Sequence, residues 1–333
     1  MNEQIQYEDD AIRQRAHQRS LAAKRRRKRQ LRKRIILSFS AIFLLLMAVL
    51  IGKGIMSLVG ESTVDASDKT SAEEKKTEQE NTTEKEAETV TEAVAASEVA
   101  APVDYTREEI IAHLEEMAAT DNRYTKIVEN VDTYPEALLR DLVNNPEMLK
   151  FVQGYPSENV TRQATLTAEE KDSDCPLFMQ WDQRWGYQAY GEDNIAVSGC
   201  GPTALSMVVV GLTHDETVTP ASVAEYAMAN GYYALETGTT WLLMTEGLTA
   251  YGVNSTEVSN SEEAMKAALD EGKYIICSMD PGDFTTAGHF IVVRGYDEEG
   301  FMINDSFCLY RSQQKWTYEQ LGWQISGMWA VGK

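Results

Sequence analysis

The sequence contains 333 residues with a formal net charge of −21 and four cysteines, and its charge is divided unevenly along the chain. Residues 1–34 hold 12 Lys and Arg against 4 Asp and Glu, a net of +8, whereas residues 104–333 hold 14 against 36, a net of −22. Residues 35–103 carry the remaining −7. A basic beginning and an acidic remainder indicate two compartments and argue against a single nucleic-acid-binding surface.

A long apolar stretch follows the basic block. Residues 35–51 contain no charged side chain, and the apolar character resumes after Lys53 as far as Val59. A helix over this stretch can reach about 30 Å, the thickness of a bilayer core, if Lys53 snorkels. A cleaved signal peptide is the alternative, but no A-x-A-like site follows. We therefore predict a transmembrane helix over residues 35–59, with the basic segment 1–34 in the cytoplasm and the rest outside the cell.

The next segment, residues 60–103, is dominated by Glu, Thr, Ala, Ser and Lys and contains no aromatic residue. Such a composition cannot bury enough apolar surface to offset the entropy of ordering the chain. We therefore predict a flexible, disordered linker here.

Helical patterns begin after the linker. Thr106 and Glu109 form the sequence pattern of a capping box, and Pro135 and Pro146 are typical of the first turns of two further helices. We predict a helical accessory segment over residues 104–173 that packs on the domain after it. An inhibitory pro-segment is the alternative interpretation.

From residue 174 the composition shifts toward aromatic residues, glycines and apolar runs typical of strands. The strand patterns cover residues 273–279, 289–296 and 300–305, and helical patterns cover 220–231 and 261–272. Helices followed by strands linked as hairpins predict an α+β fold with an antiparallel sheet. About 160 residues is enough for one buried core, so residues 174–333 are predicted to form a single domain.

Cys200 stands between two glycines at the start of a long helical pattern, "GCGPTALSMVVVGL". A cysteine in the first turn of a helix lies near the positive end of the macrodipole, which favours the thiolate. Pro202 suits a helix start, and Gly199 and Gly201 permit a tight turn and close approach of a substrate backbone to the sulfur. A buried structural cysteine would not give up the packing of both neighbours. We therefore predict a nucleophile at Cys200.

A nucleophilic thiol needs a base, and the sequence offers four histidines. His17 belongs to the cytoplasmic segment, and His113 to the accessory segment. His214 lies at the far end of the Cys200 helix, roughly 20 Å away. His289 remains, at the point where a loop leads into an alternating strand. Histidines at strand ends are often structural, but elimination of the other three favours His289 as the base.

The base should be oriented by a third group, and Asp305 and Asn304 are the candidates. The strands before and after "DEEG" form a hairpin. A three-residue loop that ends at Gly300 would place His289 and Asp305 on the same face of the sheet. A two-residue loop would bring Asn304 to that face instead. The glycine favours the longer loop and therefore Asp305.

Three motifs together carry a family resemblance: "SGCGPTALSM", "AGHFIVV", whose histidine precedes Asp305 by sixteen residues, and the upstream "MQWDQRWGY". Residues 174–331 resemble family thirty-nine of the cysteine peptidases, the bacteriocin-processing leader peptidase type within the papain-like superfamily. The resemblance implies a papain-like fold, a Cys–His–Asp catalytic set and a glutamine that donates to the oxyanion. Carried onto this sequence, these residues are Cys200, His289, Asp305 and Gln180.

Two departures separate this sequence from the transporter-linked members of that family. Their glutamine lies close before the cysteine, whereas Gln180 is 20 residues upstream of Cys200 and Gln183 competes with it. Those members also cut leaders on the cytoplasmic side, whereas this domain is predicted outside the cell and no ATP-binding cassette follows in the sequence. The resemblance is therefore to the stand-alone, secreted or anchored branch, and we do not predict cleavage after a double glycine.

The sequence thus predicts a membrane-anchored, extracytoplasmic cysteine peptidase at the bacterial cell surface, which hydrolyses peptide bonds through a thioester. A papain-like peptidoglycan amidase or endopeptidase is the first alternative, and a non-catalytic peptide-binding module on the same fold is the second. The expected partners are a peptide or protein substrate, including cell-wall peptide, and the membrane through residues 35–59, without nucleic acid.

No cofactor or metal is expected, because the sequence has no C-x-x-C motif, no His/Cys cluster and no phosphate-binding glycine loop. Three cysteines remain besides the nucleophile, namely Cys175, Cys277 and Cys308. They permit at most one disulfide, for which Cys277 and Cys308 are the pair to consider.

Overall fold

The computed structural model describes residues 98–155, 164–235 and 237–333. The predicted cytoplasmic segment (1–34), the predicted transmembrane helix (35–59) and the linker as far as residue 97 lie outside these residues. Among the helices that are described, none is long and apolar enough to cross a membrane. All described residues belong to one compact unit, Val94–Lys333.

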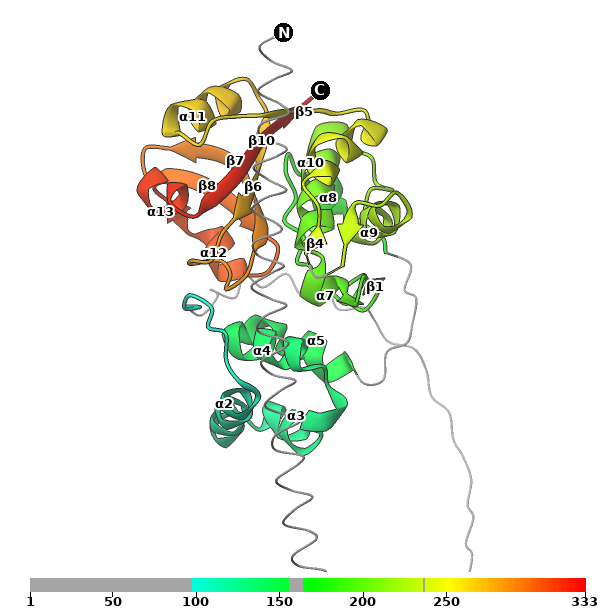
Figure 1. The fold of residues 1–333 in the computed structure, drawn as a ribbon, viewed down its shortest axis with the longest axis vertical. Coiled ribbons are helices and arrows are strands. Elements are labelled where there is room, and N and C mark those ends of the chain that lie inside the picture. The colour runs from blue at the N-terminus through cyan, green and yellow to red at the C-terminus, as the bar shows by residue number, and fades with distance from the viewer. Residues whose placement is uncertain (1–97, 156–163, 236) are drawn as a thin grey trace, which may run out of the picture. The chain divides into compact units, whose positions relative to one another are not determined.

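The first part of the described chain is helical, as the capping and proline signals predict (Figure 1). The capping box of the first helix is present, since the Thr106 hydroxyl accepts from the Glu109 N–H and the Glu109 carboxylate accepts from the Thr106 N–H. Pro146 begins a 3₁₀ turn, and Pro135 is the N-cap of its helix, just before the first turn. The helices are α2 (Arg107–Thr120), α3 (Thr125–Glu129), α4 (Glu136–Asn144) and α5 (Leu149–Gly154), joined by 3₁₀ turns at Asn122–Tyr124, Val131–Thr133 and Pro146–Met148.

These helices share an apolar core with the domain that follows. Their buried leucines and Phe151 form one cluster with Ala196, and the Phe151 ring stacks on Tyr187 with 4.2 Å between the ring centroids. Residues 98–103, predicted as the end of the linker, are instead bound to folded elements. Val99 is buried there, and the Val103 N–H donates to Asn144 Oδ1 at 2.7 Å. The helical part is therefore an integral layer of the compact unit.

An antiparallel sheet of six strands, in the order β5-β10-β6-β7-β8-β9, forms the centre of the rest of the described chain. This confirms the predicted α+β class and the three neighbouring strands β6, β7 and β8, whereas β10, inserted between β5 and β6, is not predicted. The strands are β5 (Asn254–Glu257), β6 (Tyr274–Met279), β7 (His289–Asp297), β8 (Gly300–Asp305), β9 (Lys315–Trp316) and β10 (Ile325–Gly332). Two short hairpins pair β1 (Ala189–Tyr190) with β2 (Asp193–Asn194) and β3 (Tyr233–Ala234) with β4 (Gly238–Thr239).

Helices cover both faces of this sheet (Figure 1). Ile276 and Val292 pack with α8 on one face, while the alternating residues Ile275 and Ile291 pack with α11 and α13 on the other. Burial on both faces explains why these strands are continuous apolar runs rather than alternating ones. The helices of this part are α6 (Ala168–Asp172), α7 (Ile195–Ser198), α8 (Cys200–Thr213), α9 (Pro220–Ala229), α10 (Leu242–Thr245), α11 (Glu262–Asp270), α12 (Leu309–Gln313) and α13 (Tyr318–Gly322), with a 3₁₀ turn at Gly247–Tyr251.

The β7–β8 hairpin has a shorter loop than predicted. Asp297 pairs with Gly300, so two residues rather than three form the loop, and the loop prediction is wrong. The register then shifts between Val293 and Gly295, because Arg294 is an extra residue on β7. This β-bulge reverses the change of face that the shorter loop causes. Asp305 therefore lies on the same face as His289, although for a different reason from the one expected.

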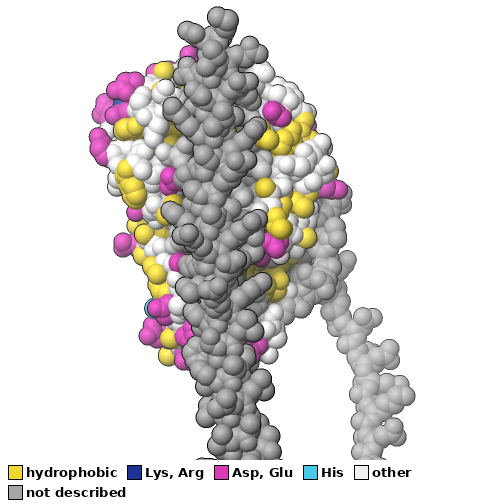
Figure 2. Space-filling model, in the orientation of Figure 1, with side chains coloured by type: hydrophobic (Ala, Val, Ile, Leu, Met, Phe, Trp, Pro, Cys, Tyr) yellow, Lys and Arg dark blue, Asp and Glu magenta, His cyan; other side chains and the backbone are white. Residues whose placement is uncertain are grey.

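The acidic excess of the chain is visible on its surface. On the face drawn in Figure 2, Asp and Glu side chains are spread over the described residues, and Lys and Arg are scarcely seen.

All four cysteines are free, so the Cys277–Cys308 pair that the sequence brings into consideration is not a disulfide.

Candidate active site

Cys200 is the first residue of α8, and Gly199 is the N-cap. At this position the backbone N–H has no partner inside the helix, and the side chain is only partly buried. The flanking glycines are also required by internal packing, whereas their predicted role in substrate approach stays a prediction. A Cβ at Gly201 would lie 2.6 Å from the Thr239 side chain, and a Cβ at Gly199 would lie 2.5 Å from the Ile195 carbonyl.

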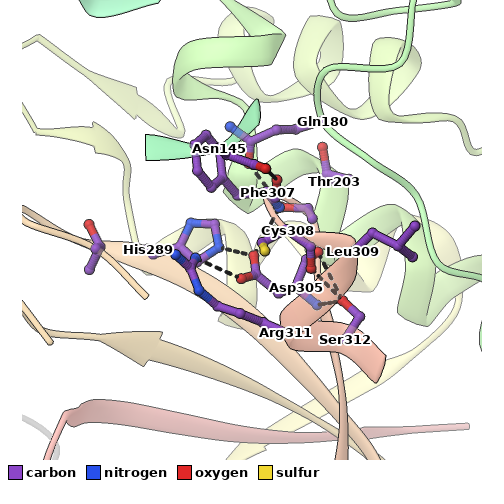
Figure 3. Close-up of polar contacts among 12 residues, drawn as sticks. Asn145, Gln180, Thr203, His289, Asp305, Phe307, Cys308, Leu309, Arg311 and Ser312 are labelled. Atoms are coloured by element: carbon purple, nitrogen blue, oxygen red, sulfur yellow. Dashed lines mark hydrogen bonds and ion pairs between the residues drawn. The ribbon is translucent and has the colours of Figure 1, made fainter. Parts of the chain in front are cut away.

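His289 is the first residue of β7 and is 7% exposed. Its Nε2 donates to Asp305 Oδ1 at 2.7 Å (Figure 3), which leaves Nδ1 as the ring nitrogen available to the Cys200 thiol. Burial lowers the pKa of His289, but the charge and hydrogen bond of Asp305, together with the hydrogen bond and charge of Cys200, raise it to about 10. The imidazole is therefore held as a cation at neutral pH.

Asp305 ends β8, and its side chain is 0% exposed. Oδ1 also accepts from the Phe307 N–H at 2.9 Å, and Oδ2 is paired with Arg311 Nη1 at 3.3 Å. Burial alone would raise the pKa of Asp305, but the charge and hydrogen bond of His289, the charge of Arg311 and the Phe307 N–H hold it below its usual value. Asp305 is therefore a carboxylate at neutral pH.

Arg311 is a residue of this site that is not predicted from the sequence. It lies on α12, six positions after Asp305, and it is buried. The sequence does contain one signal: Arg311 directly follows the apolar run "FCLY". A helix that starts with such a run is not expected to be exposed to solvent, so a buried arginine is indicated. Its partner could not be read from the sequence, because the turn between β8 and α12 decides which side chain it meets.

The two candidate glutamines differ in position. Gln180 is buried beside the site (Figure 3): its Nε2 donates to the Ala196 carbonyl at 2.7 Å, and its Oε1 accepts from the Ser306 hydroxyl at 2.9 Å. Only one of its two amide protons is used by the Ala196 bond. Gln183 instead donates to the Lys150 carbonyl of the helical part. The structure thus brings Gln180, and not Gln183, to the elements that carry the other predicted residues.

The helical part forms one side of the site. The Phe307 carbonyl, two residues beyond Asp305, accepts from Asn145 Nδ2 at 2.5 Å and from Trp181 Nε1 at 2.7 Å. The Glu147 carboxylate accepts from the N–H groups of Leu309 and Tyr310, at 2.7 and 2.9 Å. These contacts fix the turn between Asp305 and Arg311 against α4 and the 3₁₀ turn after it.

Asp141 of α4 is a second residue that is not predicted from the sequence. Burial raises its pKa to about 8; Asp193 also raises it, whereas Arg140 and His289 lower it. The charge of His289 thus lowers the pKa of a carboxyl group on the helical part. Leu138 and Leu142 are buried, so Asp141 lies at the border of the packed face of α4. The helical pattern of the sequence already indicates this position.

Within residues 98–155, 164–235 and 237–333, no group of three or more His, Cys, Asp or Glu side chains is arranged to hold a metal ion. His289 and Asp305 form a buried imidazolium–carboxylate pair, and Cys200 is among the groups that raise the pKa of His289.

A model of the Peptidase C39 like family matches residues 173–330. Residues 173–330 are therefore similar to the peptidase C39-like family. The C39-like domain contains Cys200, His289, Asp305 and Gln180, and its helices and antiparallel sheet fit the papain-like arrangement of such peptidases.

Among solved structures, the chain is similar to the peptidase domain of Streptococcus ComA, a bifunctional ABC transporter involved in a quorum-sensing pathway. The identity is 17%, the match covers 43% of this chain and 93% of that one, and the TM-score is 0.30. No match to the chain is found among curated proteins.

The raised pKa of His289 predicts a pH-dependent contribution to stability. The contribution is complete below the unfolded value of about 6.5 and is lost as the pH rises toward about 10, by no more than about 1.4 kcal/mol per pH unit. The free energy of unfolding, measured with urea between pH 6 and 10, should therefore differ less and less between wild type and His289→Gln as the pH rises. His113→Gln, at a partly exposed histidine, is the control and should run parallel to wild type. Parallel curves for His289→Gln would contradict the assigned contacts.

Proposed function

We propose that the protein is a membrane-anchored cysteine peptidase that cleaves peptide bonds outside the cell with Cys200, His289 and Asp305. The observation that supports this most directly is the His289 ring, which is hydrogen-bonded to Asp305 and whose pKa is raised by Asp305 and Cys200. The match of residues 173–330 to a model of the C39-like family supports the reaction class.

The proposed reaction is acyl transfer. The Cys200 thiolate attacks the carbonyl carbon of the scissile bond, and the C–N bond breaks as His289 gives its proton to the leaving amine. Water, deprotonated by His289, then hydrolyses the thioester and regenerates the thiolate. The ion pair with Asp305 keeps the imidazole oriented throughout, and its Nε2–H stays with that carboxylate.

The developing oxyanion needs donors beside the sulfur. The Cys200 N–H stands at the start of α8, without a partner inside the helix, and supplies the first. The second amide proton of Gln180 supplies the other, because the first is held by the Ala196 carbonyl. The bonds to Ala196 and Ser306 make this donor rigid before substrate arrives.

The anchor is proposed on the sequence alone. The uncharged stretch 35–51 preceded by twelve Lys and Arg favours a single span over residues 35–59 with the N-terminus in the cytoplasm. The C39-like domain would then face the cell exterior.

Alkylation of each cysteine against pH, followed by peptide mapping of the full chain, tests the nucleophile. Burial raises the pKa of Cys175 and Cys308 to about 12 and raises that of Cys277 as well, so these three thiols are internal controls that stay protonated. Cys200 alone should react below pH 7, and His289→Ala should move its profile toward that of a free thiol, about 8.5. Cys200→Ser should abolish cleavage of a peptide library.

An ordinary thiol profile for Cys200 in both proteins would overturn the proposal and leave the non-catalytic binding module. Release of muropeptides from purified cell wall without cleavage of the library would instead identify a peptidoglycan amidase or endopeptidase with the same three residues.

Replacement of the two glutamines tests the oxyanion donor. Gln180→Ala should lower kcat by about 10²- to 10³-fold with a smaller change in KM, because the lost bond forms only in the transition state. Gln183→Ala is the matched control, since its amide contacts the helical part instead, and should retain kcat. Equal losses in both variants would exclude the assigned role of Gln180.

Cell fractionation tests the anchor. The full chain should remain in membranes after extraction at alkaline pH, and a chain without residues 35–59 should be released into the soluble fraction. Protease added to intact cells should cleave the full chain beyond residue 60. Retention of the deleted chain in membranes would show that another segment binds there.

A further inference from the structure

Arg311 carries a charge that has no access to solvent. Its side chain is on α12, the residue is 2% exposed, and its guanidinium lies over the Phe284 ring at 5.9 Å from the centroid. Nη1 is paired with Asp305 Oδ2 at 3.3 Å, and Nη2 donates to the Ala100 carbonyl at 3.2 Å. Because a guanidinium remains charged at every accessible pH, a buried one requires such partners.

The two oxygens of Asp305 are divided between its partners. Oδ1 accepts hydrogen bonds from the His289 ring and the Phe307 N–H. Among the described residues, Oδ2 is contacted only by Arg311. The arginine therefore prevents rotation of the carboxylate about its last bond. In that fixed orientation, Oδ1 remains directed at Nε2 of His289.

Arg311 also contributes to the net charge of the site. We call Cys200, His289, Asp305 and Arg311 the charge cluster. With His289 and Arg311 as cations and Asp305 as an anion, the cluster carries one positive charge when Cys200 is a thiol and none when it is a thiolate. Without Arg311, the same ionisation would leave one uncompensated negative charge in a region of low dielectric, which is costly.

Other ionisable groups around the cluster are neutral or compensated near pH 7. Burial raises the pKa of Asp141 to about 8 and that of Cys308 to about 12, and burial also raises the pKa of Tyr190, whose hydroxyl is hydrogen-bonded to Thr239. The Glu147 carboxylate is held by the first N–H groups of α12. Asp193 is exposed to solvent and is bonded by Ser198.

We propose that Arg311 is a positioning residue of the reaction, which holds Asp305 in its orientation and supplies the positive charge that favours the thiolate of Cys200. This inference rests on the proposed function. The Ala100 carbonyl accepts from the guanidinium, so the segment before α2 also helps to hold Arg311 in place.

The test is the pH profile of Cys200 alkylation by iodoacetamide in the full chain. Arg311→Gln keeps hydrogen-bond donors and removes the charge, whereas Arg311→Lys keeps the charge. Arg311→Gln should move the midpoint to higher pH by about one unit, and thus lower the rate near pH 6 about tenfold. Arg311→Lys should stay within about 0.3 units of wild type, because the charge is what the midpoint reports. Arg184→Gln, at a partly buried arginine paired with Glu170 and Asp182, is the matched control and should superimpose on wild type.

A second pair of variants keeps the test decisive if Arg311→Gln does not fold. Asp305→Asn and the double variant Asp305→Asn with Arg311→Met differ only in the arginine, and the double variant leaves no unpaired charge buried. The double variant should alkylate Cys200 with a midpoint about one unit above that of Asp305→Asn.

The outcomes separate the two proposals. An ordinary thiol profile for wild-type Cys200 would overturn the proposed function. A perturbed wild-type profile that is unchanged in Arg311→Gln, or equal in the Asp305→Asn pair, would overturn the role of Arg311 alone and leave it a structural ion pair.

Discussion

A carboxylate without any contact to solvent organises this structure. Asp305 is fully buried, and a buried ion that loses a partner typically costs about 3–5 kcal/mol. Its three donors come from three places: the start of β7, the turn after β8, and α12. The end of β8 and the direction of α12 are therefore set by the requirement to satisfy one side chain. The Ser312 hydroxyl, bonded to the Asp305 backbone N–H at 2.8 Å, closes the same turn from the helix side.

The helical part supports this arrangement from outside the sheet. Asn145 and Trp181 donate to the same Phe307 carbonyl, although they lie on different parts of the compact unit. Glu147 holds the first N–H groups of α12, and Asp141 stands within the electrostatic reach of His289. A helical segment that packs in this way acts as a wall of the site.

Local signals in the sequence predict a large share of the elements. The capping box at Thr106, the apolar runs of β6 to β8 and the helix that begins at Cys200 all depend on neighbours within a few positions. The strand β10 is not predicted, because its pairing with both β5 and β6 is decided by long-range contacts. Arg311 and Asp141 are missed for the same reason, since each meets its partners only after distant segments pack.

The extra residue at Arg294 has a consequence for comparisons among related sequences. Each loop or strand residue inserted between His289 and Asp305 reverses the face on which the acid appears, and the bulge contributes one such reversal. Relatives with the same two-residue loop and no bulge should therefore separate the two residues by an odd number of positions rather than by sixteen. For hairpins with the same loop length, an even or odd separation between the two residues therefore indicates whether a bulge is present. This number should be counted in each unaligned sequence, because alignment gaps obscure it.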